Sequence, residues 1–128
     1  GAHTSTFQGN PIACAVACAT LREIENSKLI EHVSNSIALC FGKLKNDLIS
    51  NDFVKDVRFV GAQCAIEFNN SVTANEVQKL ALSQAKLLTY GGGRKGECVL
   101  LLPPINIDEN TLQNALTSLL EIISQGLP

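Results

Sequence analysis

The segment HTSTFQGNPIA at residues 3–13 constrains the local structure of this 128-residue chain more than any other. A cluster of hydroxyl residues at 4–6 stands shortly before Asn10-Pro11, which is a helix-start signal. Asn is a strong N-cap because its side-chain oxygen accepts an otherwise unpaired N–H, and Pro loses no hydrogen bond at the first helical position. The small-residue run IACAVACA at 12–19 continues this helix. Hydroxyls just ahead of a helix N-terminus are well placed to hold a phosphate or another anion.

Length and composition indicate one globular domain. At 128 residues the chain can bury a real core, and 45 % hydrophobic with 17 % charged residues argues against disorder. The net charge is −2, with no block of like charges, so a nucleic-acid-binding surface is not expected. No apolar run approaches the roughly 18–20 residues of a membrane span, and no signal peptide is visible. We therefore expect neither nucleic acid nor a membrane as a partner.

The cysteines favour a reduced, cytoplasmic protein. There are five, at positions 14, 18, 40, 64 and 98. The odd count and the absence of a CxxC pair are typical of free thiols rather than a disulfide framework. Cys14 and Cys18 share one helix face at i and i+4, but neither histidine has zinc-like spacing to them. We expect small packing residues there and no metal site.

Apolar spacing predicts four helices. They are expected at about Pro11–Glu25, Leu29–Ile49, Ala74–Leu88 and Glu109–Ser124. The first has a face of small side chains that allows another element to approach closely. In the second, apolar residues from Ile30 and Val33 onward recur at intervals of three and four, the helical signature. Asp108 is expected to cap the last helix.

Three strands and one loop complete the predicted layout. Val54–Phe59 and Cys64–Phe68 are rich in β-branched and aromatic residues. Cys98–Leu102 is a continuous apolar run, typical of a strand buried on both faces. The Gly91–Gly96 segment has the glycine spacing of a phosphate-binding loop, but Glu97 stands where lysine is required, so we predict a connector. The order of elements predicts an α/β fold, with helices packed on a three- or four-stranded sheet.

Several segments also resemble segments of one protein family, and they occur in the same order along the chain as in that family. Residues 3–25, HTSTFQGNPIACAVACATLREIE, resemble the segment that opens the C-terminal part of class III (omega) aminotransferases, which use pyridoxal phosphate. Three further blocks follow: DVRFVGAQCAIEF at 56–68, Leu-Leu at 87–88, and VLLLPPINI at 99–107. The resemblance covers nearly the whole chain. It implies the small C-terminal domain of fold type I pyridoxal-phosphate enzymes.

The resemblance also implies how the chain is organised. Residues 1–26 would form the phosphate-binding loop and connecting helix, and residues 27–128 the small domain. The chain has no Met and starts abruptly, which indicates a fragment without its large domain. The Schiff-base lysine and the aspartate that pairs with the pyridine nitrogen would lie in that upstream domain. The seven lysines here look like surface residues, so we expect no catalytic residue and an inactive isolated chain.

Two hydroxyl residues are the candidate cofactor ligands. From the residues alone, Thr6 either caps a turn before the helix or binds an anion. The family has a threonine directly before an aromatic residue, where it binds the cofactor phosphate of the neighbouring subunit. The resemblance therefore implies that Thr6 contacts pyridoxal phosphate across a homodimer interface. Ser5 is a weaker candidate, through its backbone N–H or its hydroxyl.

The positions of the arginines bear on how a substrate carboxylate would be recognised. Arg58 either pairs with a carboxylate such as Asp56 or Glu67, which is the preferred interpretation, or lies near a substrate entrance. Several family members carry an arginine shortly before Leu-Pro-Pro that grips a substrate carboxylate. Leu100 stands at that position here, so the carboxylate-binding group is left open, with Arg94 as a weak substitute.

Three functions remain open on the sequence. The leading one is an aminotransferase that moves an amino group between an amine or amino acid and a 2-oxo acid. The departure at Leu100 leaves an aminomutase, decarboxylase or racemase on the same scaffold open. The third is a non-enzymatic α/β binding module. That module would be a monomer without an exposed apolar face, and the small-residue helix at 12–19 argues against it.

Overall fold

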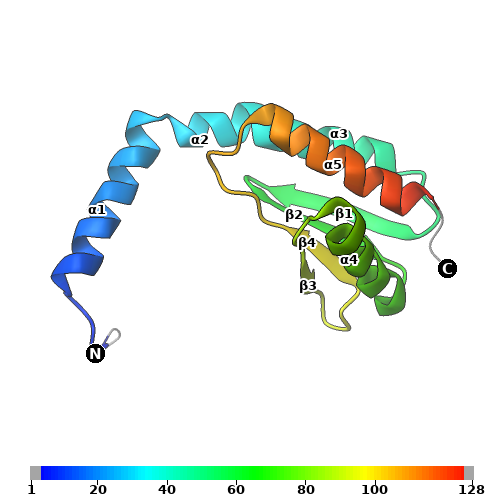
Figure 1. Cartoon of the computed structure of the whole chain (residues 1–128), viewed down its shortest axis with the longest axis horizontal. Coiled ribbons are helices and arrows are strands. Elements are labelled where there is room, and N and C mark those ends of the chain that lie inside the picture. Colours follow the sequence, from blue (N-terminus) through cyan, green and yellow to red (C-terminus); the bar gives the residue numbers. More distant parts are fainter. Residues whose placement is uncertain (1–3, 126–128) are drawn as a thin grey trace. The chain divides into compact units, whose positions relative to one another are not determined.

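The computed structural model describes residues 4–125 (Figure 1). The chain divides between residues 31 and 32 into two compact units. Within the described range, no helix combines the length and the apolar character that crossing a membrane requires.

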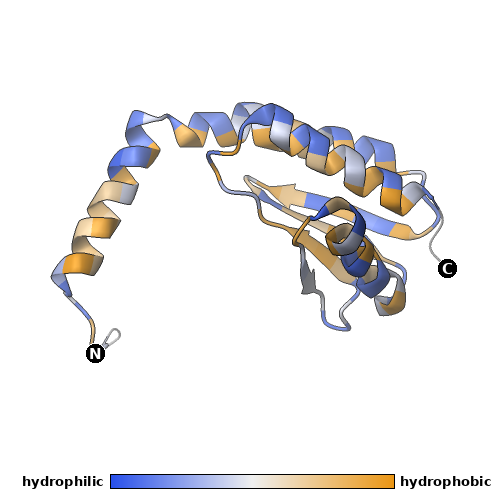
Figure 2. Ribbon diagram, viewed as in Figure 1, coloured by the Kyte–Doolittle hydropathy of each residue, from blue (hydrophilic) through white to orange (hydrophobic). Residues whose placement is uncertain are grey.

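The first unit is dominated by helix α1, Pro11–Asn26. It begins as predicted, because Asn10 Oδ1 accepts hydrogen bonds from the backbone N–H groups of Ile12 and Ala13. No residue of α1 is buried, and Val16 keeps 60 % of its surface exposed. Figure 2 shows hydrophobic residues along this helix. The helix therefore presents apolar side chains that no core within its own unit covers.

The predicted helix over 29–49 is interrupted by a π-helical turn. It consists of α2 (Leu29–His32), the turn η1 (Val33–Ile37) and α3 (Ala38–Leu48). The Ala38 N–H bonds to the Val33 carbonyl, which places one additional residue in the turn. On the N-terminal side of the turn, the buried apolar positions are therefore shifted by one residue along the sequence. Leu29 is buried, whereas Ile30, predicted to lie on the apolar stripe, is 68 % exposed.

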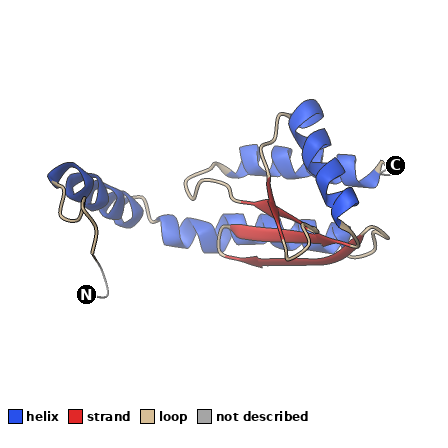
Figure 3. Cartoon of the chain, turned by 90° about the horizontal axis from the view of Figure 1, so that it is seen from below, coloured by secondary structure: helices blue, strands red, loops and turns tan. Residues whose placement is uncertain are grey.

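The second unit contains a four-stranded antiparallel sheet (Figure 3). Its strands are β1 (Val54–Val60), β2 (Gln63–Phe68), β3 (Tyr90–Gly92) and β4 (Cys98–Leu101), in the spatial order β1-β2-β4-β3. Strand β3 occupies the start of the segment predicted as a connector, because Tyr90 and Gly91 pair with Leu100 and Val99 of β4. The predicted loop is therefore wrong at Gly91 and Gly92.

Helices α4 (Ser71–Ala85) and α5 (Glu109–Ser124) both begin at side-chain caps. Asp108 Oδ1 accepts from Thr111 N at 2.9 Å, as predicted. Helix α4 begins earlier than predicted, because Asn70 Oδ1 accepts from Thr73 N at 2.9 Å. It also ends earlier, at a left-handed Lys86, so Leu88, predicted to be the last residue of this helix, lies beyond it and is exposed.

The core lies between one face of the sheet and the helices. Helices α3 and α4 contact the strands, and α5 packs against both of these helices. The inward strand side chains include Val57, Cys64, Ile66, Phe68, Val99 and Leu101. The opposite face is not covered by the described helices of the second unit, and this open face carries Arg58, Glu67 and Leu100. The predicted layer of helices on a small sheet is confirmed, with four strands.

Candidate cofactor-binding turn

Two consecutive turns precede α1. The backbone N–H of Gln8 donates to the Ser5 carbonyl at 3.1 Å, and that of Asn10 donates to the Phe7 carbonyl at 3.2 Å. Gly9 has φ +75°, a left-handed conformation at the third position of the second turn. A Cβ at Gly9 would meet nothing within 4 Å. Glycine is therefore required here by backbone conformation and not by space.

The two candidate hydroxyls have different roles in this turn. Ser5 Oγ accepts a hydrogen bond from the Phe7 N–H at 3.4 Å, so Ser5 performs the local turn capping that was an alternative for Thr6. Within residues 4–125, neither the hydroxyl nor the backbone N–H of Thr6 has a hydrogen-bond partner. Both groups are on an exposed turn. Thr6 therefore offers two unused donors, a set that suits a phosphate.

The head of α1 offers less to an anion than its sequence implies. Asn10 Oδ1 lies 3.0 Å from Ile12 N and 3.2 Å from Ala13 N. The Cys14 N–H donates to the Asn10 carbonyl at 2.9 Å, and Pro11 has no N–H. Each first-turn amide is therefore already paired. Only the field of the helix dipole remains to attract an anion from this end.

The open sheet face holds an ion-pair network around Arg58. Its Nη1 lies 2.6 Å from Glu67 Oε2 and 3.1 Å from Asp56 Oδ2, which confirms the predicted pairing. Lys55 Nζ lies 2.5 Å from the other Glu67 oxygen. Hydrogen bonds from Lys55 and Arg58 lower the pKa of Glu67, and bonds to Glu67 and Asp56 raise the pKa of Arg58. Arg58 is thus already neutralised by protein carboxylates.

Two thiols of the second unit, those of Cys64 and Cys98, are not activated nucleophiles. All five cysteines of the chain are free. Burial raises the pKa of Cys64 to about 12. Burial also raises the pKa of Cys98, although Arg58 Nη2, 3.7 Å from its Sγ, opposes that shift. A thiol with a raised pKa stays protonated near neutrality and reacts slowly. Across residues 4–125, no group of three or more His, Cys, Asp or Glu residues is arranged to hold a metal ion.

Leu100 lies on the open face of β4, opposite Ala65 of β2. Together with Val60 and Leu102 it lines a hollow beside Arg58. The lining at this position is therefore apolar. Arg94 is exposed in the segment between β3 and β4.

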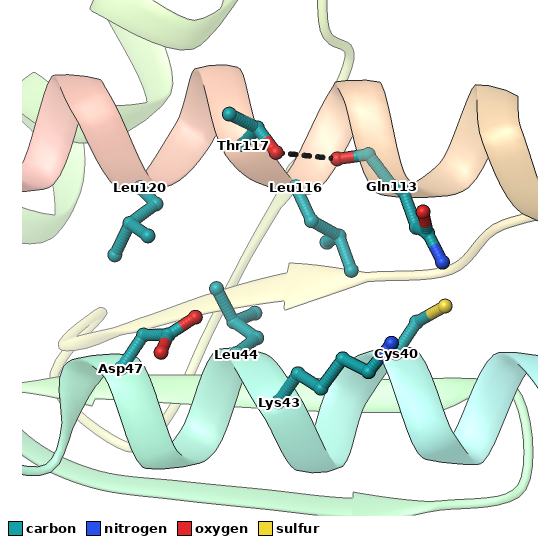
Figure 4. A pocket seen from close by; sticks show the side chains of 8 residues that line it. All are labelled: Cys40, Lys43, Leu44, Asp47, Gln113, Leu116, Thr117 and Leu120. Atoms are coloured by element: carbon teal, nitrogen blue, oxygen red, sulfur yellow. Dashed lines mark hydrogen bonds between the residues drawn. The ribbon is translucent and has the colours of Figure 1, made fainter.

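A second hollow, of about 190 Å³, lies between α3 and α5 (Figure 4). Leu44 of α3 and Leu116 of α5 line it, with Lys43 and Asp47 also on the α3 side. The Thr117 hydroxyl donates to the Gln113 carbonyl of its own helix at 2.9 Å. The hollow is therefore a groove between two packed helices, and Leu44 and Leu116, which line it, belong to the buried core.

The lysines of this chain all lie at the surface. All seven lie in the described range, and none is buried: Lys45 is partly exposed and the others are exposed. A Schiff-base lysine is commonly activated by desolvation in an apolar site. No lysine of this chain has such surroundings.

Comparison with known proteins identifies the family. The family model Aminotransferase class-III matches residues 1–123. The 4-aminobutyrate aminotransferase of Mycobacterium leprae (strain TN) is 35 % identical over 124 residues, covering 92 % of this chain and 28 % of that protein. The acetylornithine aminotransferase of Oceanobacillus iheyensis is 33 % identical over 122 residues, covering 95 % of this chain and 29 % of that protein.

A solved structure agrees in fold. The ornithine aminotransferase of Toxoplasma gondii, described with partial occupancy of PLP at its active site, matches with a TM-score of 0.82 and 28 % identity. The match covers 96 % of this chain and 29 % of that one, and it confirms the predicted α/β fold. The chain spans less than a third of the length of these relatives. By sequence and by fold, the chain belongs to the class III aminotransferase family.

Proposed function

We propose that this chain is the C-terminal part of an aminotransferase that moves an amino group between an amine or amino acid and a 2-oxo acid. Family membership supports the reaction class, and the matched proteins are named as aminotransferases of 4-aminobutyrate, acetylornithine and ornithine. The observation that carries the proposal is the Thr6 turn, where two unused donors stand on an exposed loop. A domain of this kind holds the cofactor in place and supplies part of the wall around the substrate.

In this proposal Thr6 binds the phosphate of pyridoxal phosphate, and Ser5 shapes the turn and adds a weaker contact. The cofactor, when bound, carries the amino group between the two substrates. The lysine that anchors it and the aspartate that pairs with its ring nitrogen come from the large domain. The enzyme is a cytoplasmic homodimer, in which the turn of one subunit serves the site of the other.

The apolar wall at Leu100 supports a second candidate within the same cofactor class, namely an aminomutase, decarboxylase or racemase. A half-reaction assay of the full-length enzyme with several amines separates these from a transaminase. Conversion of the bound cofactor to its amine form, with release of an oxo product, identifies transamination. The non-enzymatic module is disfavoured, because the exposed Ile12, Val16 and Leu21 of α1 contradict its expectation of no exposed apolar face.

The test of the site is Thr6→Ala in the full-length enzyme. A charge-assisted hydrogen bond contributes roughly 1.5–3 kcal/mol, so cofactor affinity should fall by about 10- to 100-fold. Thr20→Ala is the matched control, since it removes an exposed threonine hydroxyl that bonds only within α1, to the Val16 carbonyl. Equal cofactor retention in the Thr6→Ala variant and the parent would show that Thr6 does not bind the phosphate.

A mixed dimer tests the contact between subunits. One subunit lacks the upstream lysine and the other carries Thr6→Ala. If Thr6 serves the neighbouring site, one of the two sites is intact, and about half of the parent activity per mixed dimer should return. If Thr6 serves its own subunit, each site has one defect and activity stays low.

The isolated 128-residue chain should form no stable imine with pyridoxal phosphate. Borohydride trapping followed by mass spectrometry checks this. Stoichiometric trapping at a single lysine would contradict the placement of the catalytic lysine upstream.

A further inference from the structure

Asn10 links the cofactor turn to α1 through both its backbone and its side chain. Its N–H donates to the Phe7 carbonyl and closes the second turn, while its carbonyl accepts from Cys14 N–H within the helix. Its side-chain oxygen accepts from Ile12 and Ala13. One residue therefore fixes the last turn of the loop against the first turn of the helix.

Two other helices in the described part of the chain begin at side-chain caps, which allows a comparison. Asn70 accepts from one amide of α4, at Thr73 N, and Asp108 accepts at 2.9 Å from the amide of Thr111 in α5. Asn10 accepts from two amides and precedes a proline. As a result, the start of α1 has no unpaired first-turn amide, whereas Thr6, a few residues earlier, retains both of its donors.

We infer that Asn10 is a positioning residue of the cofactor site. It closes the second turn, which shares Phe7 and Gln8 with the Ser5–Gln8 turn that presents Thr6. It also keeps the first-turn amides of α1 paired, so the phosphate is bound by Thr6 and not by the helix start. This inference rests on the proposed function of Thr6. Asn10 itself contacts no cofactor in this arrangement and acts through Thr6.

Two ways of binding the phosphate predict opposite results when the Asn10 side chain is removed. If Thr6 is the ligand, Asn10→Ala removes the side-chain bonds that hold residue 10 against the start of α1, so the turns ahead of it are less firmly held and cofactor retention weakens. If the helix start is the ligand, Asn10→Ala exposes two amides to the anion, and retention stays equal or becomes tighter. The sign of the change therefore decides between them.

The experiment measures how fast the full-length enzyme loses pyridoxal phosphate into cofactor-free buffer, followed by the cofactor's absorbance. Asn10→Ala should speed the loss by about 5-fold, the factor that corresponds to one lost N-cap. Asn10→Ser, which restores a neutral capping oxygen, should return the rate to within about 2-fold of the parent. Should Asn10→Ala fail to fold, Asn10→Gly replaces it, because glycine is tolerated at the N-cap but brings no side-chain acceptor.

Asn70→Ala is the control, because it removes a cap of the same kind from α4, outside the turn. It should leave cofactor loss unchanged. An equal acceleration by Asn70→Ala would mean that general destabilisation causes the effect, and the inference would be overturned.

Coupling to Thr6 separates the inference from the proposal beneath it. In a Thr6→Ala background, Asn10→Ala should add less than about 2-fold, because a positioning residue acts through its partner. If Thr6→Ala speeds cofactor loss and Asn10→Ala does not, the positioning role alone is wrong. If Thr6→Ala itself has no effect, the proposed function of Thr6 fails.

Discussion

The two units of this chain follow the same local rules but differ in what their apolar side chains contact. Helix α1 of the first unit has a side-chain cap, a first-turn proline and a regular helical run, yet it buries no residue. Helix α3 of the second unit buries Phe41 and Leu48 completely. Local signals are therefore enough to specify a helix, whereas stability comes from the surface on which the helix packs. The small apolar residues of α1 are suited to a surface outside their own unit.

The largest expected effect is a truncation in the core of the second unit. Phe41 is fully buried, and its ring lies 6.0 Å from that of Phe59 between centroids. Phe41→Ala should lower the free energy of unfolding by about 3–5 kcal/mol, whereas Val16→Ala in α1 should change it by less than about 0.5 kcal/mol. Urea denaturation of the 128-residue chain measures both. Similar losses in the two variants would mean that α1 belongs to the cooperative core.

Substitution of one glycine in each unit tests the same difference between the two units, with smaller expected effects. Gly9→Ala forces a left-handed alanine, which costs about 1–2 kcal/mol, and in the full-length enzyme it should weaken cofactor retention by about 5- to 30-fold. Gly92→Ala instead places a Cβ 2.9 Å from Leu100 Cδ1. It should lower the unfolding free energy of the second unit by about 1 kcal/mol and leave cofactor retention unchanged. If Gly92→Ala weakened cofactor retention and Gly9→Ala did not, the separate roles of the two units would be contradicted.

Acid should weaken the second unit through Glu67. Its pKa is lowered from 4.5 by hydrogen bonds from Lys55 and Arg58. A carboxyl with a depressed pKa stabilises the fold above its unfolded value, and the stabilisation is lost as pH falls through the folded pKa. Unfolding free energy should therefore decline below about pH 4.5, and Glu67→Gln should flatten that decline. The remaining slope should come from Glu97 and Asp108, whose pKa values are also lowered. An identical pH profile in the parent and the Glu67→Gln variant would contradict this assignment.

The smallest expected effect is that of removing the first 26 residues. Since α1 buries none of its residues, its loss should change the unfolding free energy of the remaining chain by less than about 0.5 kcal/mol. Leu29, which is buried, is retained in this truncation. Far-UV circular dichroism during urea titration checks the result, and a broadened or non-cooperative transition would show that the first unit supports the second.

Caps and apolar spacing predicted most of the helices, and the failures have physical reasons. Asn10 and Asp108 marked helix starts correctly because their side chains accept first-turn amides. Strand β3 was missed because glycines have low strand propensity, and its pairing depends on β4. The π turn was missed because the apolar spacing continues through it, except that Leu29 replaces Ile30 on the buried side.

The candidate site was predictable in residue type but not in its hydrogen bonding. The position of Thr6 before an aromatic residue pointed to it, and its role in binding the cofactor stays a prediction. The sequence could not show that Ser5 takes the turn-capping role. It also could not show that Asn10 accepts from two amides, because both features depend on side-chain and backbone geometry that residue types alone do not determine.

The ends of the sheet have a consequence for solubility. Strand β1, at one edge, is interrupted by a register shift between Val54 and Asp56, where Lys55 carries a charge. Strand β3, at the other edge, has only three residues. Bulges, lysines and short outer strands all prevent a further strand from another molecule from adding to a sheet. Fibril growth through this sheet should therefore be slow, and the self-association to guard against during expression is that of the apolar side chains on α1.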